Sequence, residues 1–100
     1  MLTADLYFGR TAGDGTAWRG FLAEAVTPRF PSGFTVLDGT GQWRQRATGR
    51  IVSEPSTVVE IIAAPNAETL AALDAIRAEY RQRFAQESVG LALTESCASF

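Results

Sequence analysis

The spacing of apolar residues along the chain switches between strand and helix periods, and this order constrains the fold most strongly. Over residues 5–10, Leu6 and Phe8 alternate with small or polar neighbours, which is typical of a strand with one buried face. A loop over residues 11–15 follows. Apolar residues then recur at helical spacing: Trp18, Phe21, Leu22, Ala25 and Val26. This stripe predicts an amphipathic helix that packs against a sheet.

The first predicted helix has a start and a stop signal. Thr16 precedes the apolar stripe, and its hydroxyl can cap the helix. Pro28 disfavours helical geometry in the residue before it, so we expect the helix to end near Thr27.

The middle of the chain contains a predicted hairpin. Residues 42–46 and 50–54 are strand-like and flank the sequence Ala-Thr-Gly at 47–49. This sequence predicts a tight turn in which Gly49 takes a left-handed conformation.

Two further strands adjoin this hairpin. Residues 34–38 have a strand pattern, and the glycines within residues 38–41 predict a bulge or tight bend after it. After Pro55, residues 56–64 are apolar and rich in β-branched side chains, which predicts a central strand.

A second helix and a last strand complete the chain. Asn66 is a good helix cap, and the apolar period continues to about Ala85. The residues with this period are Leu70, Leu73, Ile76 or Arg77, Tyr80 and Phe84. Residues 88–93 are again apolar and predict the final strand.

The predicted order is strand, helix, strand, strand, helix, strand. Right-handed crossovers place both helices on one face of a four-stranded antiparallel sheet, so we expect residues 1–100 to form one ferredoxin-like α+β sandwich with an extended central hairpin. The other face, with Tyr7, Thr35, Leu37 and alternating residues of 57–63, has no helix to cover it. Because an uncovered apolar face usually finds a partner, we expect a homodimer.

Composition excludes several kinds of chemistry. All nine basic residues are arginines and they face 11 acidic ones, so the net charge of -2 disfavours nucleic-acid and membrane-surface binding. No apolar run is long enough for a membrane span. The chain has no histidine and one cysteine, Cys97, which removes the serine-histidine triad, the commonest zinc ligand and any internal disulfide. We therefore expect no metal and no cofactor, and interpret Cys97 as a buried or semi-buried structural thiol.

The stretch RFPSGFTVLDGTGQWR at 29–44 concentrates aromatic and charged residues near the predicted hairpin. One hypothesis is a pocket for a small anionic or carbonyl compound, in which an arginine holds a carboxylate and a tryptophan forms an apolar wall. Its candidate ligand-binding residues are Tyr7, Arg10, Asp38, Trp43, Arg44 and Glu54. In this hairpin register Glu54 is expected to pair with Arg44 or Arg46.

A simpler interpretation assigns the same residues structural roles. Asp38 then caps a turn, Trp43 fills a dimer seam, and the arginines keep the hairpin soluble. The leading functional hypothesis is accordingly a homodimeric binding or structural module. The alternative is a small cofactor-poor enzyme of isomerase, lyase or oxygenase type, with its pocket between sheet and helices, and this alternative rests on fold analogy.

Several stretches resemble a bacterial family of short proteins that is known only as a domain of unknown function. They are LYFGR at 6–10, VTPRFPSGFTVLDGTGQWR at 26–44, IVSEPSTVV at 51–59, ESV at 87–89 and CASF at 97–100. The resemblance covers nearly the whole chain and implies no activity, substrate or cofactor.

The resemblance also bears on the cellular compartment. The first ten residues have a charge at Asp5 and lack the basic head and apolar run of a signal peptide, which favours the cytoplasm. Family members often carry a signal segment ahead of the LYFG sequence, which implies a periplasmic or exported protein as the alternative.

Overall fold

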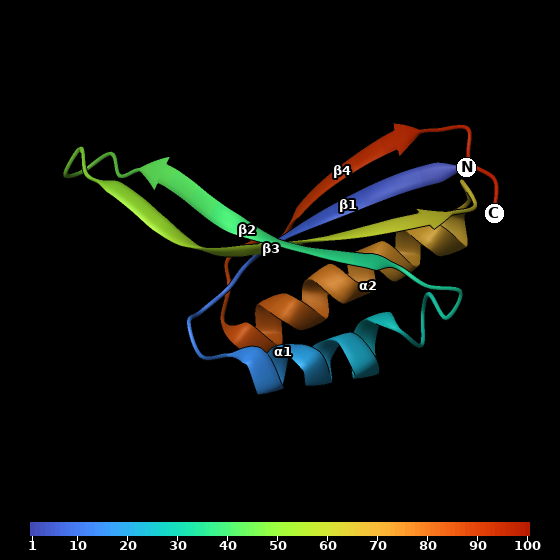
Figure 1. Ribbon diagram of the computed structural model, residues 1–100, viewed down its shortest axis with the longest axis horizontal. Coiled ribbons are helices and arrows are strands. Elements are labelled where there is room, and N and C mark those ends of the chain that lie inside the picture. The colour runs from blue at the N-terminus through green and yellow to red at the C-terminus, as the bar shows by residue number, and fades with distance from the viewer.

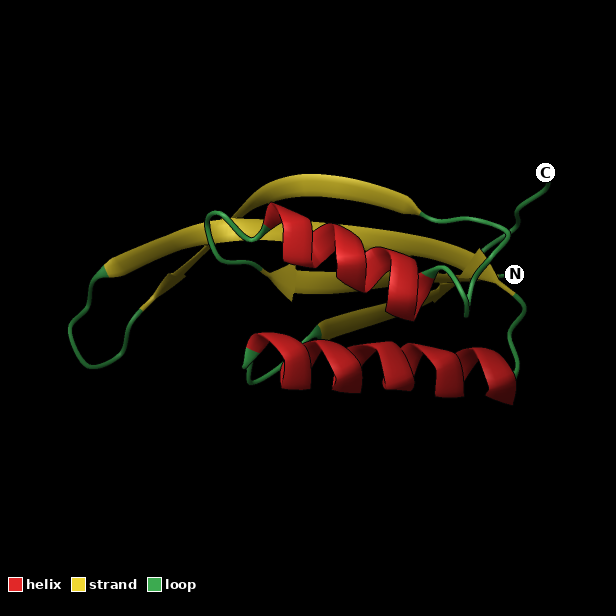
Figure 2. Ribbon diagram, turned by 90° about the horizontal axis from the view of Figure 1, so that it is seen from below, coloured by secondary structure: helices red, strands yellow, loops and turns green.

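The computed structural model describes residues 1–100 and has the predicted ferredoxin-like α+β architecture. The elements are β1 (Leu2–Gly9), α1 (Gly15–Phe21), η1 (Leu22–Val26), β2 (Thr35–Arg44), β3 (Ile51–Ala63), α2 (Ala67–Phe84) and β4 (Gly90–Glu95). The four strands form one antiparallel sheet in the order β2-β3-β1-β4. Figures 1 and 2 show both helices on one side of this sheet. The fold class predicted from the sequence is therefore confirmed.

The core lies between the sheet and the helices and is strongly aromatic. Strand β1 buries its alternate residues, including Phe8, against the helices. The ring centroid of Tyr80 on α2 lies 4.7 Å from that of Phe8 and 4.5 Å from that of Phe84. Trp18 and Phe21 of α1 pack on the same cluster, so the aromatic residues join β1 to both helices.

The first helix differs from its prediction at its start and in its second half. It begins at Gly15, and no side chain caps it, so the expected capping by Thr16 is wrong. After Phe21 the helix widens into the π-helix η1, in which the Thr27 N–H donates to the Leu22 carbonyl over 2.9 Å. The helix ends before Thr27, as Pro28 predicted.

The second helix has the predicted cap. The Asn66 side chain accepts a hydrogen bond of 2.9 Å from the Thr69 N–H, which satisfies one of the unpaired donors of the first turn. The helix ends at Ala85 in a left-handed conformation, with φ of 52°.

Strands β2 and β3 are longer and more regular than predicted. Their residues pair one to one from Thr35 opposite Glu60 to Arg44 opposite Ile51, so the bulge expected at 38–41 is absent. The glycines there have no positive φ and remain part of an ordinary extended strand.

Pro55 also lies inside β3 instead of preceding it. Its carbonyl accepts a hydrogen bond of 2.9 Å from the Arg10 N–H, on the side where β1 ends at Gly9. The missing N–H of proline points to the same side, beyond the last residue of β1 that pairs with β3, so the β1–β3 ladder loses no hydrogen bond. A proline is therefore tolerated in the middle of this strand.

The ends of β2 and β3 form a hairpin arm, which we define as residues 40–55. Strand β1 pairs with β3 only as far as Ser56, so the arm extends beyond the rest of the sheet, as Figure 1 shows. Gln45 and Arg50 close its turn through a backbone hydrogen bond of 2.8 Å. Gly49 has a φ of 69°, which confirms its predicted left-handed conformation.

The sheet face opposite the helices, which we call the open face, has no covering element (Figure 2). Leu37, Val58 and Tyr7 lie side by side on it in register, and Leu37 and Tyr7 are 55% and 45% exposed. Cys97, beyond β4, is exposed, so its interpretation as a buried thiol is wrong. Neither helix is long and apolar enough to cross a membrane.

Candidate functional site

The six candidate ligand-binding residues do not surround one cavity. Strand alternation puts Tyr7, Trp43 and Glu54 on the open face. Tyr7 lies opposite Val58 of β3, and Trp43 and Glu54 are an even number of residues away from Leu37 and Val58 on their own strands. Asp38 and Arg44 belong to the opposite face of β2. The sixth residue, Arg10, follows β1, and its side chain reaches Asp38 on the side of the helices.

Arg10 is the centre of the polar cluster on the helix side. Its guanidinium donates to Asp14 through Nη2 at 2.5 Å and Nε at 3.2 Å, and to the Thr57 hydroxyl through Nη1 at 3.0 Å. The guanidinium carbon lies 4.6 Å from the centre of the Trp18 ring, which adds a cation–π contact. Only 14% of the Arg10 side chain is exposed.

The loop after β1 brings Asp14 onto Arg10. Gly13 takes a φ of 84°, and the Asp14 N–H donates to the Thr11 carbonyl, so the chain turns back within one short loop. The hydrogen bond from Arg10 holds the pKa of Asp14 below its usual range, although burial acts in the opposite direction. The Asp14 carboxyl is therefore ionised at neutral pH.

Asp38 completes the cluster at its solvent-exposed rim. Thr57 donates to Asp38 Oδ1 over 2.9 Å, and Arg10 Nη1 lies 3.5 Å from the same oxygen. The Asp38 side chain is 80% exposed, which is not the burial that acid–base chemistry by this residue requires. The cluster borders a recess of about 350 Å³.

This recess is poorly suited to an anion. Its one arginine, Arg10, already binds Asp14 through two nitrogens, so an anionic ligand would have to compete with an ionised carboxylate. The exposed charge at its rim is the carboxylate of Asp38. The arrangement instead locks the end of β1 to the first helix and to β3.

The remaining predicted residues lie away from the recess. The carboxylate of Glu54 lies over Gly9: a Cβ atom at Gly9 would be 2.6 Å from Glu54 Oε1. Arg44 and Arg46 form no salt bridge with Glu54, so the pairing expected from the hairpin register is wrong.

Tyr80 has a buried hydroxyl group. The sequence pattern predicted only that this residue belongs to the apolar face of the second helix. It is fully buried, and its hydroxyl donates a hydrogen bond of 2.6 Å to the Gly9 carbonyl. Burial raises the pKa of Tyr80 to about 12, and the negative charge of Asp14 adds to this rise. The hydroxyl therefore stays protonated and fixes the end of β1 from the helix side.

A pair of carboxyl groups on the open face also escaped the sequence analysis. Asp5 and Glu60 are directly opposite in the pairing of β1 with β3. The hydrogen bond with Asp5, followed by its negative charge, raises the pKa of Glu60. Asp5 Oδ1 is the one buried side-chain polar atom without a hydrogen-bond partner. Alternation within each strand could have identified this pair once the register was known.

Comparison with solved structures finds the same fold in proteins of very different sequence. A phage SAM lyase in complex with S-methyl-5'-thioadenosine superposes with a TM-score of 0.72 and 20% identity, over 94% of this chain and 80% of that chain. CutA from Synechococcus elongatus superposes with a TM-score of 0.63 and 14% identity, over 98% of this chain and 79% of that chain. At these identities the likeness shows a shared fold alone.

Sequence comparison assigns the family directly. No curated protein is significantly similar to the chain. A family model described as a protein of unknown function, DUF3574, matches residues 3–100. The match covers every strand and helix except Leu2 of β1, and it includes the Arg10 cluster and the hairpin arm. The chain therefore belongs to the DUF3574 family, whose function is unknown.

Proposed function

We propose that this chain is a homodimeric module in which two copies pack through the open faces of their hairpin arms. The observation that carries the proposal is that the open face of β2 has a large exposed side chain close to two positions without side chains. The exposed Trp43 side chain forms a projection, and the side-chain-free positions Gly39 and Gly41 form a notch.

The open face supplies the apolar surface that association requires. Leu37, Val58 and Tyr7 form a band across three strands, and Trp43 lies opposite Val52 farther along the arm. Large apolar side chains gathered on one uncovered face typically mark an interaction surface. A two-stranded arm is also only marginally stable in water, so packing against a second copy would stabilise it.

The notch is open to a partner. A Cβ atom at Gly39 would meet nothing closer than the Ser56 carbonyl oxygen at 3.9 Å, and one at Gly41 nothing closer than Ser56 Cβ at 3.6 Å. Both positions and Trp43 lie on one strand face, because they are separated by even numbers of residues.

A two-fold axis makes these features complementary. If the axis passes near Gly41, residues equally far before and after it exchange places, and Trp43 of each copy lies over Gly39 of the other. Such an interface uses the same surface patch twice, which is the rule for two-fold dimers. The tryptophan ring would cover the notch, and large apolar area would be removed from water at the centre of the contact.

The test is the mass of the native protein in solution, measured by light scattering after gel filtration and by native mass spectrometry. We expect twice the 10.8 kDa chain mass for the wild type and single-chain mass for Trp43→Ala. Gly41→Leu is the sharper variant, because the chain itself has room for the side chain and the partner does not.

Thr40→Leu is the matched control. It introduces the same side chain on the same strand, but on the face opposite the proposed interface, and should leave the dimer intact. A monomeric wild-type chain, or a Gly41→Leu variant that dimerises as well as Thr40→Leu, would overturn the proposal.

A further inference from the structure

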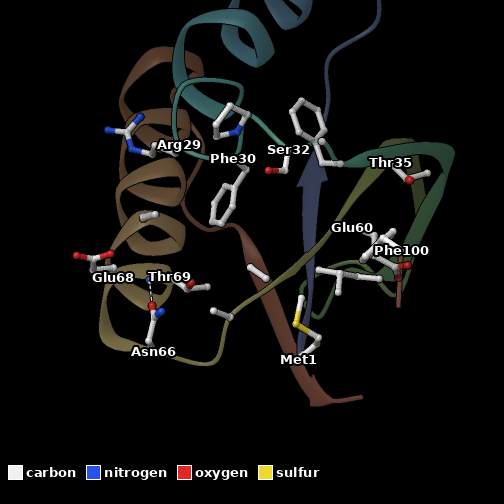
Figure 3. Close-up of a pocket in the computed structure, with 17 residues that line it drawn as sticks. Met1, Arg29, Phe30, Ser32, Thr35, Glu60, Asn66, Glu68, Thr69 and Phe100 are labelled. Atoms are coloured by element: carbon white, nitrogen blue, oxygen red, sulfur yellow. Dashed lines mark hydrogen bonds between the residues drawn. The ribbon is translucent and has the colours of Figure 1, made fainter. Parts of the chain in front are cut away.

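A second hollow lies at the other end of the sheet from the hairpin arm. It is a cavity of about 850 Å³ between the start of α2, the end of β3 and the segment 29–35 (Figure 3). This volume is within the range of roughly 300 to 1,000 Å³ that small-molecule sites usually have. None of the residues of the hairpin arm lines the cavity.

The strand lengths create this cavity. Strand β2 begins at Thr35, opposite Glu60, whereas β3 continues to Ala63. Beyond Glu60, β3 therefore has β1 on one side and no strand on the other. The segment leading into β2 crosses this gap instead, and it turns at Gly33 with a φ of 120°.

Two aromatic side chains line the cavity, and small side chains leave space between them. Phe30 and Phe34 line the cavity and are partly buried against the core. Ile62 of β3 contributes a further apolar side chain, and Ala63 and Ala72 leave space between strand and helix. A flat apolar group fits between such surfaces.

One buried polar side chain of the lining has a hydroxyl without a partner. Thr69 lines the cavity from α2 and is only 8% exposed, and its side chain is labelled in Figure 3. Its backbone N–H binds Asn66 Oδ1, but its hydroxyl makes no hydrogen bond within the chain. Asp5 Oδ1 is the only side-chain polar atom that is both shielded from solvent and without a hydrogen-bond partner. The Thr69 hydroxyl has no partner, so it is not shielded from solvent. It is therefore accessible from the cavity.

Asn66 adds a second polar group beside Thr69. Its side-chain oxygen is occupied by the Thr69 N–H, which leaves the amide nitrogen as a donor at the edge of the same cavity. Together the two side chains offer a donor and a hydroxyl that can donate or accept, which suits a polar group on an otherwise apolar ligand.

The charges around the cavity select against anions. Its titratable side chains are Glu60, Glu68 and Arg29. Arg29 is already used, since it donates to the Ala25 carbonyl over 2.8 Å and lies 4.0 Å from Glu79. Met1 also lines the cavity, and its ammonium group donates to the Ser96 carbonyl over 3.1 Å. Two of the three titratable side chains are carboxyl groups, which disfavours a negatively charged ligand.

We propose that this cavity binds an uncharged aromatic small molecule, with the rings against Phe30 and Phe34 and a hydrogen-bonding group at Thr69 and Asn66. The inference does not depend on the dimer, because the arm residues take no part in the cavity.

The test uses two fluorescent probes with the same aromatic body. N-phenyl-1-naphthylamine is neutral and carries one N–H donor, whereas 8-anilinonaphthalene-1-sulfonate adds a negative charge. With the full chain we expect saturable binding of one neutral probe per chain and binding of the sulfonate that is about tenfold weaker or more. Equal affinity for both probes, or no saturable binding of the neutral one, would overturn the proposal.

Variants then locate the binding. Ala72→Trp should fill the cavity and abolish probe binding, and Thr69→Val should keep the shape while weakening binding about fivefold through the lost hydrogen bond. Trp43→Ala is the control and should bind normally, because it removes the exposed aromatic ring elsewhere. A probe that is lost with Trp43→Ala and retained with Ala72→Trp binds the arm, which contradicts the proposal.

A measurement on the wild-type chain guards against misfolded variants. Amide chemical shifts recorded during titration with the neutral probe should move at Phe30, Thr69 and Ala72 and remain unchanged in the arm. Shifts confined to residues outside the cavity would refute the assignment.

Discussion

The hydroxyl of Tyr80 offers the sharpest test of how the aromatic core holds the sheet. Tyr80→Phe removes the donor that binds the Gly9 carbonyl over 2.6 Å and keeps the ring among Phe8, Phe21 and Phe84. The change therefore isolates one hydrogen bond from the packing of the fully buried ring.

The expected cost follows from that burial. Deleting the donor of a buried hydrogen bond costs roughly 1 to 2 kcal/mol, because the acceptor does not regain a water molecule. For a domain of this size, the melting temperature should fall by about 5 to 15 °C. Loss of the ring itself would cost more, since a large cavity would then be left behind.

The raised pKa adds a signature that packing alone cannot produce. The pKa of Tyr80 is about 12 in the fold, compared with 10.0 for an ordinary tyrosine. Its contribution to stability is therefore complete below pH 10 and is lost as the pH rises from 10 toward 12. Because phenylalanine does not ionise, the stability difference between wild type and Tyr80→Phe should shrink across this range.

The assay is urea unfolding followed by tryptophan fluorescence at neutral and alkaline pH. Tyr7→Phe is the matched control. Tyr7 is half-exposed on the open face of β1, the strand that carries Gly9, so loss of its hydroxyl should cost less than about 0.5 kcal/mol. The reasoning is refuted if Tyr80→Phe unfolds like the wild type, or if Tyr7→Phe is equally destabilised.

Three further predictions concern the core and the carboxyl groups. Leu73→Ala, at a fully buried position of α2, should cost about 2 to 5 kcal/mol in urea unfolding, and a loss below 1 kcal/mol would contradict its place in the core. The pKa of Asp14 is lowered by Arg10, so wild-type stability should decline as the pH falls through and below 3.8; Asp14→Asn should be less stable at neutral pH and lack this decline in thermal melts. The pKa of Glu60 is raised by Asp5, so wild-type stability should decrease as the pH rises above 4.5; Glu60→Gln should melt higher than wild type at pH 7, and an unchanged or lower melting temperature would exclude repulsion within the pair.

The element order could be predicted because it depends on local periodicity. The apolar stripe of residues 18–26 and the cap at Asn66 were readable from the sequence, since each acts within a few neighbouring residues. The continuity of β2 was not, because Gly39 and Gly41 are extended only through their pairing with β3. The same limit applies to Pro55, whose place in β3 depends on where β1 stops.

The polar clusters show the corresponding limit for sites. Arg10 and Asp38 were both chosen as candidates, and they do meet, but through Thr57 and beside an Asp14 that the sequence assigned only to a loop. Trp43 lies on the hairpin as predicted. That it lies on the open face, away from Arg10 and Asp38, follows only from the strand register. Cavities depend on strand lengths, so no local pattern indicated the hollow near Thr69.

Pro55 has a consequence for how far association can proceed. Beyond the end of β1, the outer edge of β3 in the arm is exposed and would otherwise be a template for an added strand. A strand that approached this edge would find a carbonyl already bonded to Arg10 and no N–H at Pro55. Strand addition at this edge is thereby interrupted at Pro55, next to the end of β1, while the broad faces of the arm remain free to meet a partner.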